Sequence, residues 1–330
     1  MADLTTKYLG IELKNPIIIG SSGLTSTLED IVQLEQCGAA AVVLKSIYEE
    51  EILVEASKNY KEAQASNLIY TQLSESLDYI DVHVKDKRLA EYLQLVRDAK
   101  KKTLIPIIGS INCVTDLEWI DYAIKIQEAG ADALELNIFL NPVNPEPIGY
   151  EKLIERITRK VLKSITIPVS VKLSDNFTNL TETVVRVSKT GVSGIVMFNR
   201  FYMPDIDIYN MSIVPGRIHS NESEYVKSLR WVALLSDKID CSIAASTGIH
   251  DSNTIIKQLL AGADAVQIVS ALYINGKQYI NQLLSGIEQW MLNKGFFSIS
   301  QFKGQASYRK AVNPAVYERV QFMKHFGRIS

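Results

Sequence analysis

The 330-residue sequence has little of what marks several large classes of protein. Its three cysteines, Cys37, Cys113 and Cys241, lie far apart and lack the CxxC spacing of zinc and redox motifs. Its apolar runs, such as NPIIIG and AAAVVLK, fall far short of the roughly 20 residues that cross a bilayer. The four histidines have no carboxylate or cysteine at ligand spacing, which argues against a metal site. Because MADLTTKYLG has no basic segment followed by an apolar one, we expect a cytoplasmic protein without a membrane span.

An excess of charge of one sign is also missing. The 35 basic and 37 acidic side chains leave a net charge of −2, so no electrostatic footprint for nucleic acid or an anionic membrane is present. A small-molecule substrate is therefore the expected partner. Hydrophobic residues make up 47% of the chain, which is enough for one large core. No glycine-rich boundary or low-complexity stretch divides the sequence, and we expect a single domain over residues 1–330.

Short apolar runs that end in small or polar residues recur along the chain. They are NPIIIGSSG, AAAVVLKS, IPIIGSIN, DALELN, PVSVKLS, SGIVMFN, DCSIAAST and DAVQIVS. Such runs are typical of parallel strands buried on both faces. Helical patterns lie between them, among them residues 85–102. Eight such alternations predict an α/β protein of the (β/α)8 TIM-barrel class.

Two segments exceed what the barrel needs. Residues 47–84 are too long for an ordinary connection between a strand and a helix, so we expect a long loop over the barrel mouth. Residues 305–330 form a C-terminal extension, in which Asn313 and Pro314 predict the start of a helix. Val316, Val320 and Met323 would form the apolar side of that helix.

Polar residues follow every predicted strand, where a barrel of this kind places its reactive groups. They are Ser21, Ser22 and Gly23; Lys45 and Ser46; Ser110 and Asn112; Asn137; Lys172; Asn199; Ser246, Thr247 and Gly248; and Ser270. Lys45 and Lys172 are either solvated surface charges or cations that require an anionic partner in the mouth. Asn137 and Asn199 either cap the following turns or offer amide groups to a planar heterocycle.

The last two predicted strands end in ASTGI and QIVSALY. Small residues and backbone N–H groups at this place form the usual phosphate site of a barrel. His250 follows at the start of a predicted helix, where it could contact the phosphate. The alternative is that Gly248 only makes a tight turn.

The order NPIIIGSSG, VVLKS, LELN, VSVKL, MFN, STGI and VQIVSALY, from about Leu4 to Gly304, resembles the dihydroorotate dehydrogenase family, especially its class 1 flavoproteins. The resemblance implies an FMN across the barrel mouth, with its phosphate at Gly248 and Ser270. It implies flavin contacts at Ser21, Ser22, Gly23, Lys45, Ser46, Asn137 and Lys172, and substrate contacts at Lys45, Asn137 and Asn199. It also implies hydride transfer between a substrate carbon and the flavin, in pyrimidine biosynthesis, while a base takes the neighbouring proton.

The sequence departs from this family at the base itself. After their ELN and one hydrophobic residue, class 1 relatives continue with Ser-Cys-Pro-Asn, whereas here ELNI continues with FLNP. Leu140 stands in the place of the catalytic cysteine, and an alkyl side chain accepts no proton. Pro142 stands where the family has an asparagine that binds substrate. Cys113 and His83 are the replacement bases to consider, although an inert buried thiol and a surface histidine are the simpler interpretations.

Three hypotheses therefore stand side by side. The first is an FMN-dependent oxidoreductase that acts on a CH–CH group of a small heterocyclic or unsaturated substrate, with true dihydroorotate activity in doubt. The second is a non-catalytic flavin-binding protein, and the third is a flavin-free barrel that binds a phosphorylated metabolite. No motif identifies the electron acceptor, and a homodimer remains an option for the assembly.

Overall fold

The computed structural model describes residues 2–48, 73–113, 116–138, 149–200 and 203–317. Its central feature is a closed barrel of parallel strands in the order β4-β3-β13-β12-β9-β8-β7-β6, which the pairing of β4 with β6 completes. The strands are β3 (Ile17–Ile19), β4 (Ala41–Val43), β6 (Ile107–Asn112), β7 (Ala133–Asn137), β8 (Val169–Leu173), β9 (Gly194–Met197), β12 (Ser242–Ser246) and β13 (Ala265–Ile268). The TIM barrel predicted from the sequence is confirmed.

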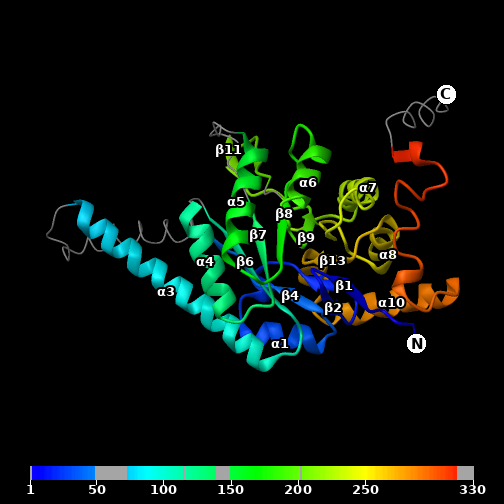
Figure 1. The fold of residues 1–330 in the computed structure, drawn as a ribbon, viewed down its shortest axis with the longest axis horizontal. Coiled ribbons are helices and arrows are strands. Elements are labelled where there is room, and N and C mark those ends of the chain that lie inside the picture. The colour runs from blue at the N-terminus through cyan, green and yellow to red at the C-terminus, as the bar shows by residue number, and fades with distance from the viewer. Residues whose placement is uncertain (1, 49–72, 114–115, 139–148, 201–202, 318–330) are drawn as a thin grey trace.

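Helices surround the barrel (Figure 1). They are α1 (Leu28–Gln36), α3 (Leu73–Lys102), α4 (Asp116–Glu128), α5 (Tyr150–Ser164), α6 (Leu180–Ser188), α7 (Tyr225–Leu235), α8 (Ser252–Ala261), α9 (Ser270–Asn275) and α10 (Tyr279–Lys294), with short 3₁₀ turns at Gly23–Thr25, Ile299–Gln301 and Pro314–Tyr317. Helix α8 shows the local rules: the Asp251 side chain accepts a hydrogen bond from the N–H of Thr254 at 2.6 Å, and the helix ends at Gly262 with a φ of +116°. The left-handed conformation at Gly262, which glycine adopts without strain, therefore ends this helix.

A hairpin formed by β1 (Thr6–Tyr8) and β2 (Ile11–Leu13) covers the amino-terminal end of the barrel. Tyr8, Leu9 and Leu13 are buried there against the first residues of the strands, such as Ala41 and Ala133. This end is therefore filled with apolar side chains, and the polar strand ends face the opposite opening.

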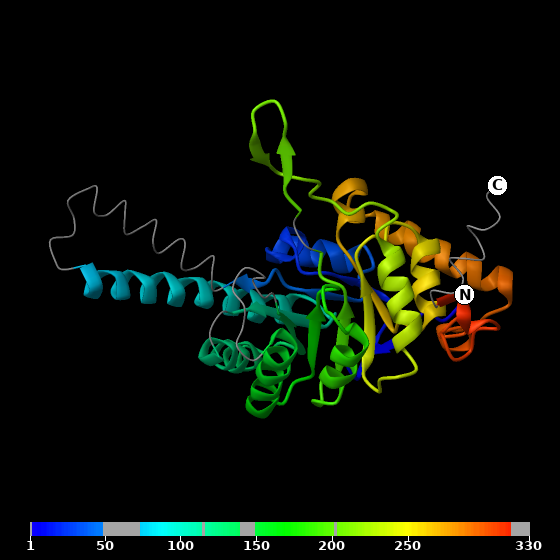
Figure 2. The same cartoon turned by 90° about the horizontal axis from the view of Figure 1, so that it is seen from above.

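The segment predicted as a loop over the mouth is partly helical. Ile47 and Tyr48 form β5, which pairs with the end of β6, and residues 49–72 lie outside the described residues. Residues 73–84 are the first turns of α3, and in Figures 1 and 2 this half of the helix extends away from the barrel. The physical reason is that SESLDYIDVHVK contains no glycine or proline to stop a helix.

A second hairpin, absent from the sequence-based expectations, lies between β9 and α7. It consists of β10 (Asp205–Asp207) and β11 (Ser212–Val214), and Figure 2 shows it projecting from the body of the molecule. Ile206, Tyr209 and Met211 are exposed on it.

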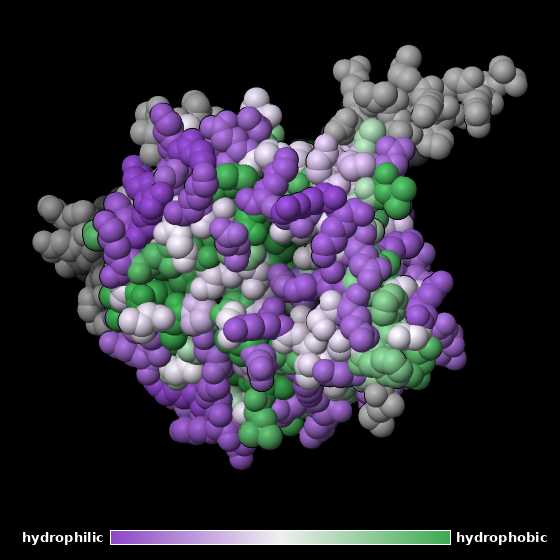
Figure 3. All heavy atoms as spheres, turned by 45° about the vertical axis from the view of Figure 1, so that its right-hand side comes forward, coloured by the Kyte–Doolittle hydropathy of each residue, from purple (hydrophilic) through white to green (hydrophobic). Residues whose placement is uncertain are grey.

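The described part of the C-terminal extension packs on the barrel helices. The N–H of Ala306 donates to the carbonyl of Leu260 at 2.8 Å, and the N–H of Tyr308 donates to the carbonyl of Ala233 at 2.8 Å. The Tyr317 hydroxyl donates to the carbonyl of Ala306 at 2.6 Å. Figure 3 shows this side of the molecule, where hydrophobic groups are scattered among hydrophilic ones.

The assignment of residues 1–330 to one domain stays a prediction. None of the described helices is both long and apolar enough to span a bilayer.

The packing of the described part of the C-terminal extension makes the helix predicted from Asn313 onward testable. A 3₁₀ turn over Pro314–Tyr317 stands at its start, and residues 318–330 lie outside the described residues. We expect this helix to be docked on other parts of the protein, because a helix this short is marginal in water on its own. Docking would give slow hydrogen exchange over residues 315–326. Exchange as fast as in a peptide of the same sequence, while α10 stays protected, would contradict docking.

Candidate active site

The carboxyl ends of the strands bring a chain of hydroxyl groups together. The Ser21 and Ser46 Oγ atoms are 3.0 Å apart, and the N–H of Ser46 donates to Ser21 Oγ at 2.8 Å. Ser46 Oγ lies 2.7 Å from Ser110 Oγ. The Tyr92 hydroxyl of α3 accepts from the N–H of Ser110 at 2.8 Å and donates to its carbonyl at 3.2 Å. Burial raises the pKa of Tyr92, so the phenol stays neutral and can make both bonds.

Two amides predicted for the site lie side by side. The Asn199 Nδ2 donates to Asn137 Oδ1 at 2.8 Å, and Asn137 Nδ2 donates to the Tyr48 hydroxyl at 3.2 Å and to Ser46 Oγ at 3.4 Å. Asn137 is buried at the end of β7, and Asn199 is half-buried just beyond β9. Sequence reasoning missed Tyr48, because the signal for it was only a tyrosine two residues after the predicted strand end.

Lys172 lies at the centre of the barrel in a closed triangle of side chains. Its Nζ donates to Gln267 Oε1 at 3.0 Å and forms an ion pair with Glu135 Oε1 at 3.4 Å. Gln267 Nε2 donates to Glu135 Oε2 at 2.6 Å. The anionic partner expected for this lysine is thus a carboxylate of the protein itself. Glu135 and Gln267 were not predicted as site residues, because each is a single polar residue within an apolar run.

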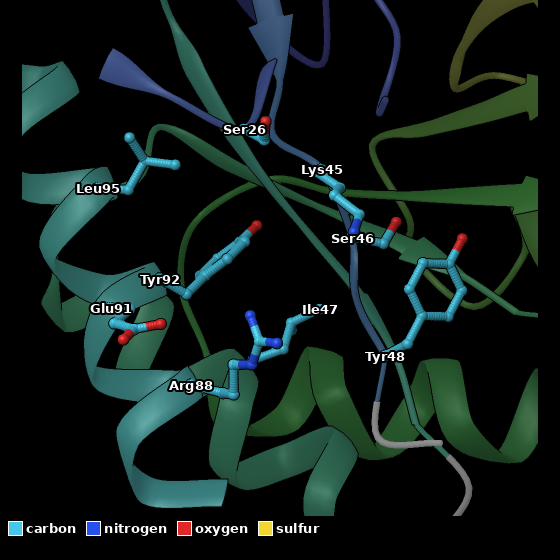
Figure 4. Close-up of a pocket in the computed structure, with 9 residues that line it drawn as sticks. All are labelled: Ser26, Lys45, Ser46, Ile47, Tyr48, Arg88, Glu91, Tyr92 and Leu95. Atoms are coloured by element: carbon cyan, nitrogen blue, oxygen red, sulfur yellow. The ribbon is translucent and has the colours of Figure 1, made fainter. Parts of the chain in front are cut away.

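Lys45 has a different environment from Lys172. It is exposed and lines a pocket of about 250 Å³ at the edge of the mouth. Figure 4 shows Lys45 and Tyr48 on the strand side of this pocket and Arg88, Glu91 and Tyr92 of α3 on the other side. Of the two alternatives that the sequence leaves open, Lys172 is therefore the buried cation with an anionic partner, whereas Lys45 is exposed at this pocket. The predicted roles of Lys45 toward flavin and substrate stay predictions.

The turn after β12 has the features expected of an anion site. Thr247 and Gly248 both have a positive φ of 74°, and a Cβ on Gly248 would lie 2.2 Å from the backbone nitrogen of Tyr225. Glycine is therefore required by the close approach of α7. The backbone N–H groups of Gly248 and Ile249 are in buried residues and donate to no described residue. Such groups normally have a partner, so the turn is suited to an oxyanion.

Ser270 and His250 stand beside this turn. Ser270 Oγ accepts from the N–H of Ser220 at 3.0 Å, and Ser220 Oγ lies 3.0 Å from His250 Nε2. His250 is thus buried and hydrogen-bonded within the protein. A second pocket of about 410 Å³ adjoins Thr247 and Asn199 on the opposite side of the mouth from Lys45.

The part of the chain that the structure describes does not identify a general base. Leu140 and Pro142 lie outside the described residues, and nothing is described of the side chain of His83, which belongs to α3. Cys113 follows β6 and is buried.

Ser22 and Gly23 lie beside β3, where a Cβ on Gly23 would meet the Tyr273 hydroxyl at 2.7 Å. Among the described residues, no group of His, Cys, Asp and Glu could hold a metal ion.

The sequence of this chain is similar to those of known proteins. Residues 3–291 match the model of a family described as dihydroorotate dehydrogenase. The catalytic subunit of dihydroorotate dehydrogenase B (NAD(+)) from Thermoplasma volcanium is 28% identical over 324 residues, covering 94% of this chain and 100% of that protein. The protein of the same name from Pyrococcus abyssi is 29% identical over 315 residues, covering 92% and 99%. The NAD-dependent dihydropyrimidine dehydrogenase subunit PreA from Escherichia coli K12 is 25% identical over 321 residues, covering 92% and 77%.

Proposed function

The chain belongs to the dihydroorotate dehydrogenase family, and we propose that it is an oxidoreductase that uses FMN to transfer hydride from or to a small heterocyclic or unsaturated substrate. The family and the relatives support the coarser statement, an oxidoreductase of this type. The choice of FMN and of the substrate class is our proposal. The observation that carries it is the buried cation Lys172 beneath a mouth ringed by amides and hydroxyls.

The residues present fit FMN in their chemistry. Lys172 would supply positive charge to a ring that becomes more negative on reduction. Ser21, Ser46 and Asn137 would supply hydrogen bonds to the polar edge of the ring. The N–H groups of Gly248 and Ile249, beside Ser270, would hold the phosphate. When bound, FMN accepts or donates hydride, which none of the side chains can do.

The substrate side of the proposal rests on Lys45, Asn137 and Asn199. The paired amides present donors and acceptors side by side, which suits a heterocycle with alternating carbonyl and N–H groups. Relatives are named for dihydroorotate and for dihydropyrimidine, so we propose a reduced or oxidised ring of this size. Because some relatives are called catalytic subunits, we propose a second protein as the electron acceptor. We further propose a cytoplasmic enzyme that binds neither nucleic acid nor membrane.

Purified protein should be yellow and carry one non-covalent FMN per chain. The absorbance spectrum, followed by chromatography of the flavin released on heating, measures both the identity and the stoichiometry. A colourless protein that does not bind added FMN would exclude the proposal and favour the flavin-free barrel. Flavin that is bound, but reduced only by dithionite and by no dihydropyrimidine, would favour the non-catalytic flavin-binding protein.

A further inference from the structure

Three buried side chains in the barrel interior form one network of hydrogen bonds and an ion pair. Glu135 is 1% exposed, Gln267 is 2% exposed and Lys172 is 7% exposed. Glu135 and Lys172 come from neighbouring strands β7 and β8, whereas Gln267 comes from β13, which β12 and β9 separate from β8. Only closure of the barrel brings Gln267 to the other two.

The hydrogen bonds fix the role of each group. The Gln267 amide accepts from Lys172 at 3.0 Å and donates to Glu135 at 2.6 Å, so its orientation is set by its two neighbours. The Glu135 carboxylate has one oxygen towards Lys172 and the other towards Gln267. The ammonium group has three donors, and two of them point to Glu135 and Gln267.

The charges in this network are poorly screened. Water and salt weaken the interaction of exposed charges, but an interaction across a protein interior is reduced much less. A buried cation next to the flavin would favour the reduced, more negative ring, and a carboxylate behind that cation would oppose part of the effect. The balance between Lys172 and Glu135 therefore decides how strongly the protein favours reduced over oxidised flavin.

We propose that Glu135 is a positioning residue that, through Lys172, lowers the reduction potential of the bound flavin. Gln267 holds the carboxylate and the ammonium in contact. This inference rests on the proposed FMN function, and it concerns three side chains that are bonded to one another in the barrel interior. It explains why a carboxylate is buried in the barrel interior.

The decisive variant is Glu135→Gln, which removes the negative charge and keeps the shape. We expect the ratio of the FMN dissociation constants, oxidised over reduced, to rise about tenfold. For a two-electron couple this corresponds to a rise of about 30 mV in the midpoint potential. Titration of the flavin-free protein with FMN and a spectroscopic redox titration measure the two quantities independently of turnover.

Gln267→Leu is the matched control, because it breaks the same triangle but leaves both charges in place. In Gln267→Leu, the ratio of the FMN dissociation constants, oxidised over reduced, should stay within about threefold of the wild-type value. In Lys172→Gln, this ratio should move in the opposite direction to that in Glu135→Gln. Equal shifts in Glu135→Gln and Gln267→Leu would show a structural role only and would overturn the proposal. No rise in Glu135→Gln would overturn it as well.

If Glu135→Gln does not fold, Glu135→Asp provides the test. Its shorter side chain moves the carboxylate away from Lys172 and keeps the charge, so the ratio should rise by a smaller factor. An unchanged or lower ratio would overturn the inference. Failure of the proposed function looks different, because the wild-type protein would then bind no FMN at all.

Discussion

Dihydroorotate should reduce the bound flavin slowly or not at all. By the sequence resemblance, Leu140 takes the place of the cysteine base of class 1 relatives, and loss of a positioned general base typically costs about 10²–10⁴ in rate. The side chains that we propose to hold FMN are present, so binding of FMN and slow chemistry should occur together. Anaerobic stopped-flow mixing, followed through the loss of the oxidised flavin band, measures this rate.

Leu140→Cys is the control for that prediction, and we expect little rescue from it. By the sequence resemblance, Pro142 replaces the asparagine through which the family binds substrate, so the contacts of that amide are not available here. A cysteine restored without these contacts has no correctly placed substrate to deprotonate.

Rapid reduction of the unmodified protein by dihydroorotate would contradict the prediction and show that another group acts as the base. Cys113 and His83 are the first candidates from the sequence. The structure adds Tyr48, because its hydroxyl contacts Asn137 at 3.2 Å. Cys113→Ser, His83→Gln and Tyr48→Phe would then separate the three.

Lys172→Ala should release FMN and destabilise the flavin-free protein. The substitution leaves the Glu135 carboxylate buried without its cation, and breaking a buried pair in this way typically costs about 3–5 kcal/mol of folding free energy. The site would at the same time lose the positive charge that Lys172 offers to a bound flavin. Urea unfolding of the flavin-free protein and titration with FMN measure the two effects.

Lys45→Ala is the matched comparison, because Lys45 is exposed and lines the pocket beside α3. We expect its free energy of unfolding to change by less than about 1 kcal/mol, as is usual for exposed charges. Equal stability and equal FMN affinity in Lys172→Ala and the wild type would show that the triangle does not support the site.

The sequence by itself determined the barrel and the edge at which the site lies. A strand covered on both faces must be apolar throughout, and the eight apolar runs therefore marked the eight strands. Ser21, Ser46, Asn137 and Asn199 follow four of those strands, and parallel strands necessarily end at the same rim. The structure brings these residues together as expected, and their roles toward FMN and substrate stay predictions.

Only the tertiary structure decided which polar residues are partners. The sequence gives no sign that Gln267 of β13 meets Glu135 of β7, because the contact depends on closure of the barrel. The same holds for Gly248, whose lack of a side chain is explained by the backbone of Tyr225 rather than by its own turn alone. Local patterns indicate which segments are buried, whereas the burial of a strand-end lysine and the identity of its partner depend on strands and helices that are distant in the chain.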